Sequence, residues 1–65
     1  MMSSGHEEAR ACLASNAAWR RESAALRDQA TQRHLEPEVK LTLLRQADAA
    51  ERQADWWLNA AIDAG

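Results

Sequence analysis

Glu36-Pro37-Glu38 is the stretch that decides the fold, because it holds the only helix breaker between Gly5 and Gly65. The residue before a proline is disfavoured in the α-helical region, whereas proline itself is well tolerated in the first turn of a helix. One helix therefore ends before this stretch and another begins at it. A short connection makes the two helices antiparallel neighbours. The predicted fold is an all-α, antiparallel two-helix hairpin.

The ends of both helices carry further signals. Ser4 followed three residues later by Glu7 has the spacing of a capping box, which favours a helix start. Arg33 and His34 suit the negative carboxyl end of a helix dipole. The predicted boundaries are a first helix over about residues 4–34, a turn at residues 35–36 and a second helix over about residues 37–63, all within one domain of residues 1–65.

Both predicted helices have a seven-residue repeat, which is typical of left-handed helix bundles. In the second helix, steps of three and four residues meet only apolar side chains from Leu43 to Ala64. The corresponding line of the first helix is less apolar, because it includes Asn16 and Ser23. From these lines, the predicted hairpin core is Cys12, Trp19, Leu26, Leu43, Ala47, Ala50, Ala54 and Trp57.

Asn16 and Ser23 have two interpretations on the sequence alone. As small polar residues they can allow close packing while they bond to the backbone or to each other. A buried Asn16 can instead select the register or the oligomeric state, as polar core residues do in coiled coils. The sequence leaves both interpretations open.

The second helix has more large apolar side chains than one contact line can cover. Large apolar patches are rare on soluble monomers, and tryptophan is enriched in protein interfaces. Adjacent helical residues point about 100° apart, so Trp56 and Trp57 cannot share one small core. We expect Trp57 inside the hairpin and Trp56 in a contact with another chain. The reverse assignment, with Trp56 in the core, and Trp56 lying across its own helix surface are the alternatives that stay open. The predicted partner interface is Leu41, Trp56, Leu58 and Ile62.

The composition excludes several classes of function. The net charge is −2 and Cys12 is the only cysteine, which favours a cytoplasmic protein without an internal disulfide. No apolar run is long enough to span a bilayer, and the N-terminus lacks the pattern of a secretory signal. His6, Cys12 and His34 do not have the spacing of metal ligands, and no carboxylate is placed as a general acid requires. We expect no catalysis, no cofactor, no metal and no membrane partner.

Arginines of the first helix form a possible nucleic-acid contact. Arg20, Arg21 and Arg27 lie near Trp19, and Arg33 extends the group. Glu22 and Asp28 dilute this charge, and net acidity opposes phosphate binding, so a solvated face is the preferred interpretation.

The sequence from Trp19 to Ala61 resembles short, uncharacterised bacterial proteins that form alanine- and arginine-rich helical hairpins. The matching residues are Arg20, Arg21, Glu22, Ala25, Leu26, Arg27, Glu36-Pro37-Glu38, Leu43-Leu44, Ala47, Glu51 and Ala54. Glu36, where aspartate is commoner, and the pair Trp56-Trp57 depart from the pattern. The resemblance implies the hairpin fold and brings no established activity.

The sequence supports two hypotheses of function. The first is a non-enzymatic interaction module or small accessory or inhibitory subunit, which forms a homodimeric four-helix bundle or docks on a larger protein. The second is a small dimeric RNA- or DNA-binding regulator that uses Arg20, Arg21 and Arg27.

Overall fold

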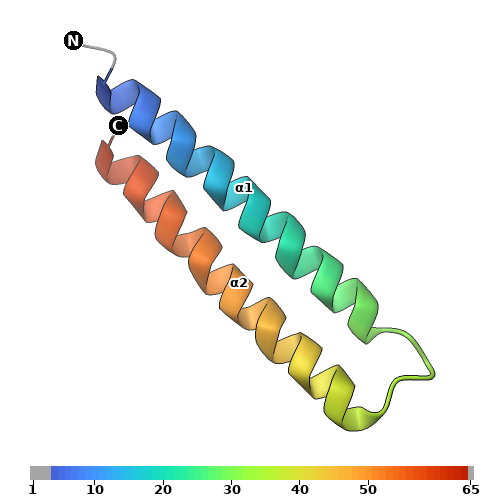
Figure 1. Cartoon of the computed structure of the whole chain (residues 1–65). Helices are drawn as coiled ribbons and strands as arrows, with labels where there is room; N and C mark the ends of the chain where they lie inside the picture. Colours follow the sequence, from blue (N-terminus) through green and yellow to red (C-terminus); the bar gives the residue numbers. More distant parts are fainter. Residues whose placement is uncertain (1–3, 65) are drawn as a thin grey trace.

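The computed structural model describes residues 4–64, and these form a two-helix hairpin. Helix α1 spans Ser4–Ala30 and helix α2 spans Pro37–Ala64. The two helices run antiparallel and side by side, so the start of α1 and the end of α2 lie together and the connection lies at the far end (Figure 1). The predicted all-α hairpin is confirmed.

Helix α1 ends about four residues before its predicted end, because the hydrogen bonds at Thr31 reach back three residues instead of four. The Thr31 backbone N–H donates to the Asp28 carbonyl oxygen at 3.2 Å, and its hydroxyl donates to the same oxygen at 2.7 Å. The Gln32 N–H then donates to the Gln29 carbonyl oxygen at 3.3 Å. These are three-residue bonds, which commonly close the last turn of a helix. Arg33 and His34 therefore lie in the connection.

Helix α2 begins where the proline predicts. The Glu36 carbonyl oxygen accepts the first helical bond, from the Lys40 N–H at 3.0 Å, so Glu36 is the N-cap and Pro37 is the first helical residue. The helix continues to Ala64, one residue beyond the prediction. Helix α1 begins at Ser4 as predicted, but the side chain of Ser4 lies outside the described part, so the capping box stays a prediction.

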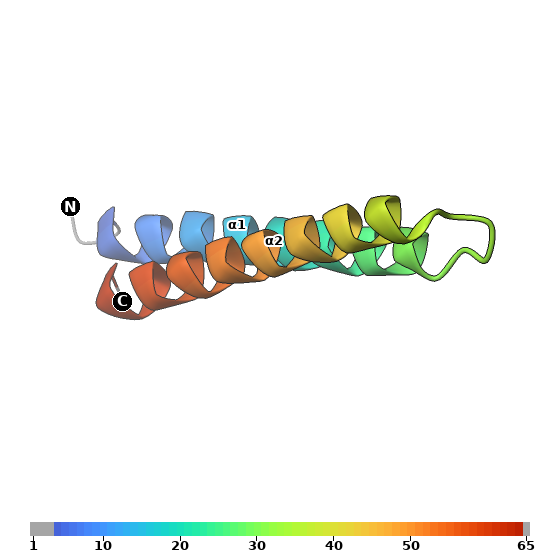
Figure 2. The same ribbon diagram turned by 90° about the horizontal axis from the view of Figure 1, so that it is seen from below.

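Small side chains form the contact between the helices. Within residues 5–64 the buried side chains are Ser23, Ala30, Ala47, Ala50, Ala54 and Ala61, and none of the larger ones is fully buried. The Cα atoms extend only 13 Å across the hairpin. Because each helix has a Cα radius of about 2.3 Å, the axes lie about 8 Å apart, at the short end of the usual range. The helices cross at a shallow angle (Figure 2).

The predicted core is partly wrong. Ala47, Ala50 and Ala54 are buried, but Trp19 is 37% exposed and is not a core residue. The contact line of α1 runs through Asn16, Ser23 and Ala30, spaced by seven residues. Helices this close leave no room between them for an indole, so Trp19 lies beside the line. The half-buried members of the predicted core are Cys12, Leu26, Leu43 and Trp57.

The hairpin is long and thin. Its Cα radius of gyration is 15.3 Å, whereas a compact chain of this length has about 11 Å. It exposes 4988 Å² of surface, against about 4100 Å² for a compact protein of its mass. An isolated hairpin therefore leaves about 900 Å² more surface in water than a compact fold would.

Candidate interaction surfaces

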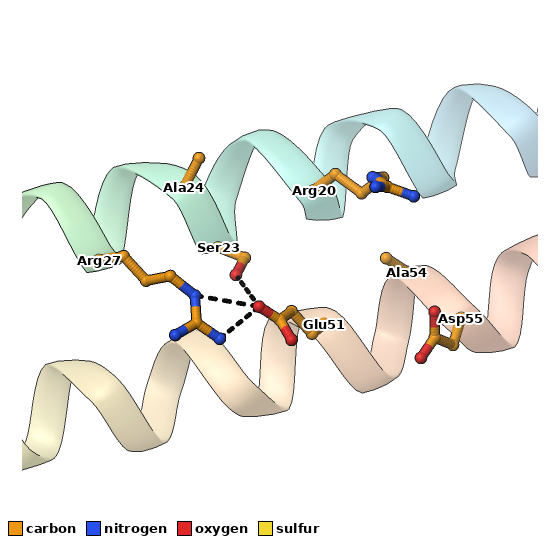
Figure 3. A pocket seen from close by; sticks show the side chains of 7 residues that line it. All are labelled: Arg20, Ser23, Ala24, Arg27, Glu51, Ala54 and Asp55. Atoms are coloured by element: carbon orange, nitrogen blue, oxygen red, sulfur yellow. Dashed lines mark hydrogen bonds and ion pairs between the residues drawn. The ribbon is translucent and has the colours of Figure 1, made fainter.

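The hairpin has two long sides, and one of them is charged. A shallow hollow on this charged side lies between the middle parts of the two helices (Figure 3). Its lining residues are Arg20, Ser23, Ala24 and Arg27 from α1, and Glu51, Ala54 and Asp55 from α2.

Glu51 is the centre of the polar contacts on the charged side. Its Oε2 accepts a hydrogen bond from the Ser23 hydroxyl at 3.2 Å and one from Arg27 Nε at 3.0 Å. Arg27 Nη2 also donates to the same oxygen, and it donates to Asp48 Oδ1 at 3.2 Å. Figure 3 shows one oxygen of the Glu51 carboxylate facing both Ser23 and Arg27. The cluster connects α1 to two successive turns of α2.

The charges of this cluster reinforce one another. The hydrogen bond from Arg27 lowers the pKa of the Glu51 carboxyl below its ordinary value, against an opposing effect of desolvation. The charge of Arg27, the Ser23 hydroxyl and the charge of Arg20 lower it further. The hydrogen bond and charge of Glu51 in turn raise the pKa of Arg27. Neither group changes its charge near neutral pH, so the Arg27–Glu51 ion pair links the two helices there.

A second polar contact between the helices lies closer to the start of α1 and the end of α2. The Asn16 side-chain amide donates to the Ala54 carbonyl oxygen at 2.6 Å. This is the backbone bond that one of the two interpretations of Asn16 expects. Because it joins one residue of α1 to one residue of α2, it also favours a single register of the hairpin.

Of the four arginines of the predicted nucleic-acid contact, only Arg20 and Arg27 line the same hollow. Arg27 is engaged by Asp48 and Glu51. Arg33 lies in the connection, beyond the end of α1. Arg20 and Arg21 are adjacent in a helix and therefore point about 100° apart. Carboxylates line the charged side together with the arginines, which counts against phosphate binding there.

The opposite side of the hairpin is nearly uncharged, apart from Glu22 and Glu38 at its hollows; we call it the uncharged side. One shallow hollow there is lined by Trp19, Glu22, Leu26, Gln46, Ala49, Ala50 and Gln53. A second, which shares Gln46, is lined by Glu38, Val39, Thr42, Leu43 and Gln46. A stripe of α2 on this side, stepping by three and four residues, contains no charged residue; we call it the uncharged stripe. Its members are Val39, Thr42, Gln46, Ala49, Gln53, Trp56 and Ala60.

The predicted partner interface does not form one surface, although most of it is exposed. Leu41, Trp56 and Ile62 are 49%, 60% and 67% exposed, and Leu58 is half-buried. Residues seven apart share a helix side. Trp56 therefore lies with Ala49 on the uncharged side.

The other members of the predicted set point elsewhere. By the same seven-residue step, Leu58 and Ile62 lie with Glu51 and Asp55 on the charged side. Leu41 points away from α1, about 160° around the helix from the core residue Leu43. The single Trp56, Leu58 and Ile62 surface expected from the sequence is wrong, because Trp56 and Leu58 are separated by about 160° around the helix.

The three tryptophans lie on the uncharged side. The rings of Trp56 and Trp57 meet edge to face, with centroids 4.8 Å apart and planes at 89°. Trp19 shares a hollow with Gln53, which is one turn from the Trp56-Trp57 pair. This side was not predicted as one surface. The signal was available, since the charged residues of α2 all avoid one heptad-spaced line beside the core line.

A metal site requires several ligand side chains close together, and a membrane span requires a long apolar helix. Among residues 4–64, no three His, Cys, Asp or Glu side chains are grouped to hold a metal ion. Neither α1 nor α2, as described, has the length and hydropathy required to cross a membrane.

No family model matches this chain, and no curated protein or solved structure is detectably similar to it. The resemblance to bacterial helical hairpins therefore stays a prediction.

Proposed function

We propose that this chain is a non-enzymatic protein–protein interaction module that works through apolar side chains left exposed by the hairpin. One observation carries the proposal: the contact between α1 and α2 fully buries only alanines and one serine of the described residues, while large apolar side chains stay in water. The large side chains that are most exposed are Leu13, Trp19, Val39, Leu41, Trp56 and Ile62.

The energetics of burial favour association. Apolar surface contributes about 25 cal/mol per Å² removed from water, and an alanine has little of it. Chains of this size usually need a disulfide, a metal or oligomerisation to be stable. Cys12 is a free thiol, and it is the only cysteine, so no internal disulfide can form. Covering the exposed tryptophans is a direct way to add the missing apolar burial.

The simplest assembly is an antiparallel four-helix bundle of two hairpins, in which each helix has a neighbour in its own chain and another in the second chain. Docking on a larger protein would use the same exposed side chains. A nucleic-acid-binding regulator is the weaker alternative, because Arg27 is already paired with Asp48 and Glu51.

The test is the solution mass by light scattering together with thermal unfolding over about a hundredfold range of concentration. We expect a mass above that of one chain and a midpoint that rises with concentration, because association stabilises the folded state by mass action. We also expect the absorbance ratio at 260 and 280 nm to show no nucleic acid.

Trp56→Ala should weaken association at least tenfold and leave helical circular dichroism intact at high concentration. Ile62→Ala is the matched control, since it also truncates an exposed apolar side chain but on the charged side of α2. A monomer whose unfolding midpoint does not depend on concentration would overturn the proposal.

A further inference from the structure

Helix α2 carries two parallel heptad lines, and only one of them is buried in the hairpin. The core line, through Ala47, Ala50 and Ala54, packs on α1. The uncharged stripe, through Gln46, Ala49 and Gln53, lies roughly 60° to 140° around the helix from it. Two adjacent contact lines on one helix are typical of a four-helix bundle, where each helix has two near neighbours.

The uncharged side is two helices wide. Trp19 and Leu26 of α1 line the same hollow as Ala49 and Gln53 of α2. A single partner helix would cover one row of this side and leave the other in water. A flat partner made of two helices of similar length covers both rows, and a second copy of this hairpin is such a partner.

The charge distribution also favours a second copy. A two-fold interface places the same surface patch against itself, so a strongly charged side would meet its own charge. The uncharged stripe avoids this repulsion. Its polar members Gln46 and Gln53 carry amides, which both donate and accept hydrogen bonds and can therefore pair across a two-fold axis. Arg45 and Arg52 border the stripe near Ala49 and can offset the charge of Glu22 from the second chain.

The surface that the hairpin exposes agrees with a dimer of two copies. The hairpin exposes 4988 Å², about 900 Å² more than a compact protein of its mass. A stable interface covers about 800 Å² on each partner. One face of the hairpin, placed against another copy, therefore removes about the amount of surface that the elongated shape leaves exposed.

We infer that the uncharged side packs against the same side of a second copy, antiparallel and around a two-fold axis, with Trp19, Ala49, Gln53 and Trp56 in the interface. This inference rests on the proposed function and identifies its partner and its surface. The charged side, with Glu51 and Arg27, then faces solvent in the dimer.

Ala49→Glu tests the inference by placing a carboxylate on the uncharged stripe. In the folded monomer this position is exposed, and Arg45 and Arg52 lie one turn away on either side, so the helix tolerates the new charge. In the dimer the carboxylate would be buried or would meet its own copy. We expect the dissociation constant, measured by sedimentation equilibrium, to rise at least tenfold.

Ala24→Glu is the matched control, because Ala24 is exposed on the charged side and points away from α2 (Figure 3). It should leave the dissociation constant within about twofold of the natural chain. Gln53→Leu should lower the constant several-fold, because it adds apolar area to the proposed interface.

Two outcomes would overturn the inference, and they differ in what they say about the proposed function. If Ala49→Glu leaves the dimer intact and Ile62→Glu dissociates it, the chains associate through the charged side; the interaction function stands and the inference fails. If the natural chain is monomeric and its unfolding midpoint does not depend on concentration, both fail.

Discussion

Ser23 shows at the scale of one residue why this hairpin uses small side chains. It is buried at 4% exposure, and its hydroxyl donates to Glu51 on the other helix. Helix axes about 8 Å apart leave room for serine and alanine, whereas leucine there would push the helices apart. The polar residues that weaken the apolar line of the sequence are thus at the centre of the contact.

Glu51 provides a pH-dependent prediction at the same scale. Its folded-state pKa is lowered from the ordinary value of 4.5, so its stabilising contribution is present above that value and is lost as the pH falls through the folded-state pKa. We expect Glu51→Gln to destabilise the hairpin slightly near pH 7 and to have no effect once Glu51 is protonated. Urea unfolding of both chains between neutral pH and pH 2 measures the difference.

Arg27→Ala is the control for this prediction. Without the guanidinium, the main cause of the lowered pKa is gone, so Glu51→Gln should change stability little at any pH. Added salt should also reduce the effect, because both side chains are about half exposed. A stability gap between the natural chain and the Glu51→Gln variant that persists at the lowest pH would contradict the role assigned to the charge.

At the scale of the elements, the connection explains the difference between predicted and observed helix ends. Proline predicted the start of α2 correctly, because its effect on the preceding residue is local and steric. The end of α1 was placed too late, since nothing as strong as proline marks it. Thr31 ends the helix through its hydroxyl and N–H, which both bond to the Asp28 carbonyl oxygen.

Glu36 is a poor N-cap, and this leads to a prediction for α2. Aspartate has a shorter side chain that bonds well to the backbone N–H groups of the first turn. Glu36→Asp should therefore stabilise the hairpin by about 0.5–1 kcal/mol, measured by urea unfolding at fixed protein concentration. Glu38→Asp, the same change two residues later, should give no such gain. Equal effects of the two substitutions would show that capping is not the cause.

At the scale of the whole molecule, the proposed dimer makes a prediction about shape. The hairpin is 54 Å long with a radius of gyration of 15.3 Å. Two hairpins packed side by side with centres about 10 Å apart double the mass but raise the radius of gyration by only about 1 Å. Small-angle X-ray scattering of the dimer measures this. A maximum dimension near twice the hairpin length would indicate an end-to-end contact and contradict the side-by-side arrangement.

The sequence by itself determined the hairpin, its antiparallel direction and the buried alanines of α2. These depend on local rules, namely the proline effect and the helical period, which need no knowledge of the other helix. The separation of the helices depends on both contact lines together, and therefore only the tertiary structure placed Trp19 outside the core.

The tertiary structure likewise decided which side of the hairpin each apolar residue of α2 occupies. Leu58 and Ile62 lie with Glu51, whereas Trp56 lies with Ala49, which lines the same hollow as the α1 residue Trp19. A surface built from two helices depends on how far each is rotated about its axis. That rotation is set by packing at Ser23, Ala50 and Ala54, where small side chains allow the closest approach.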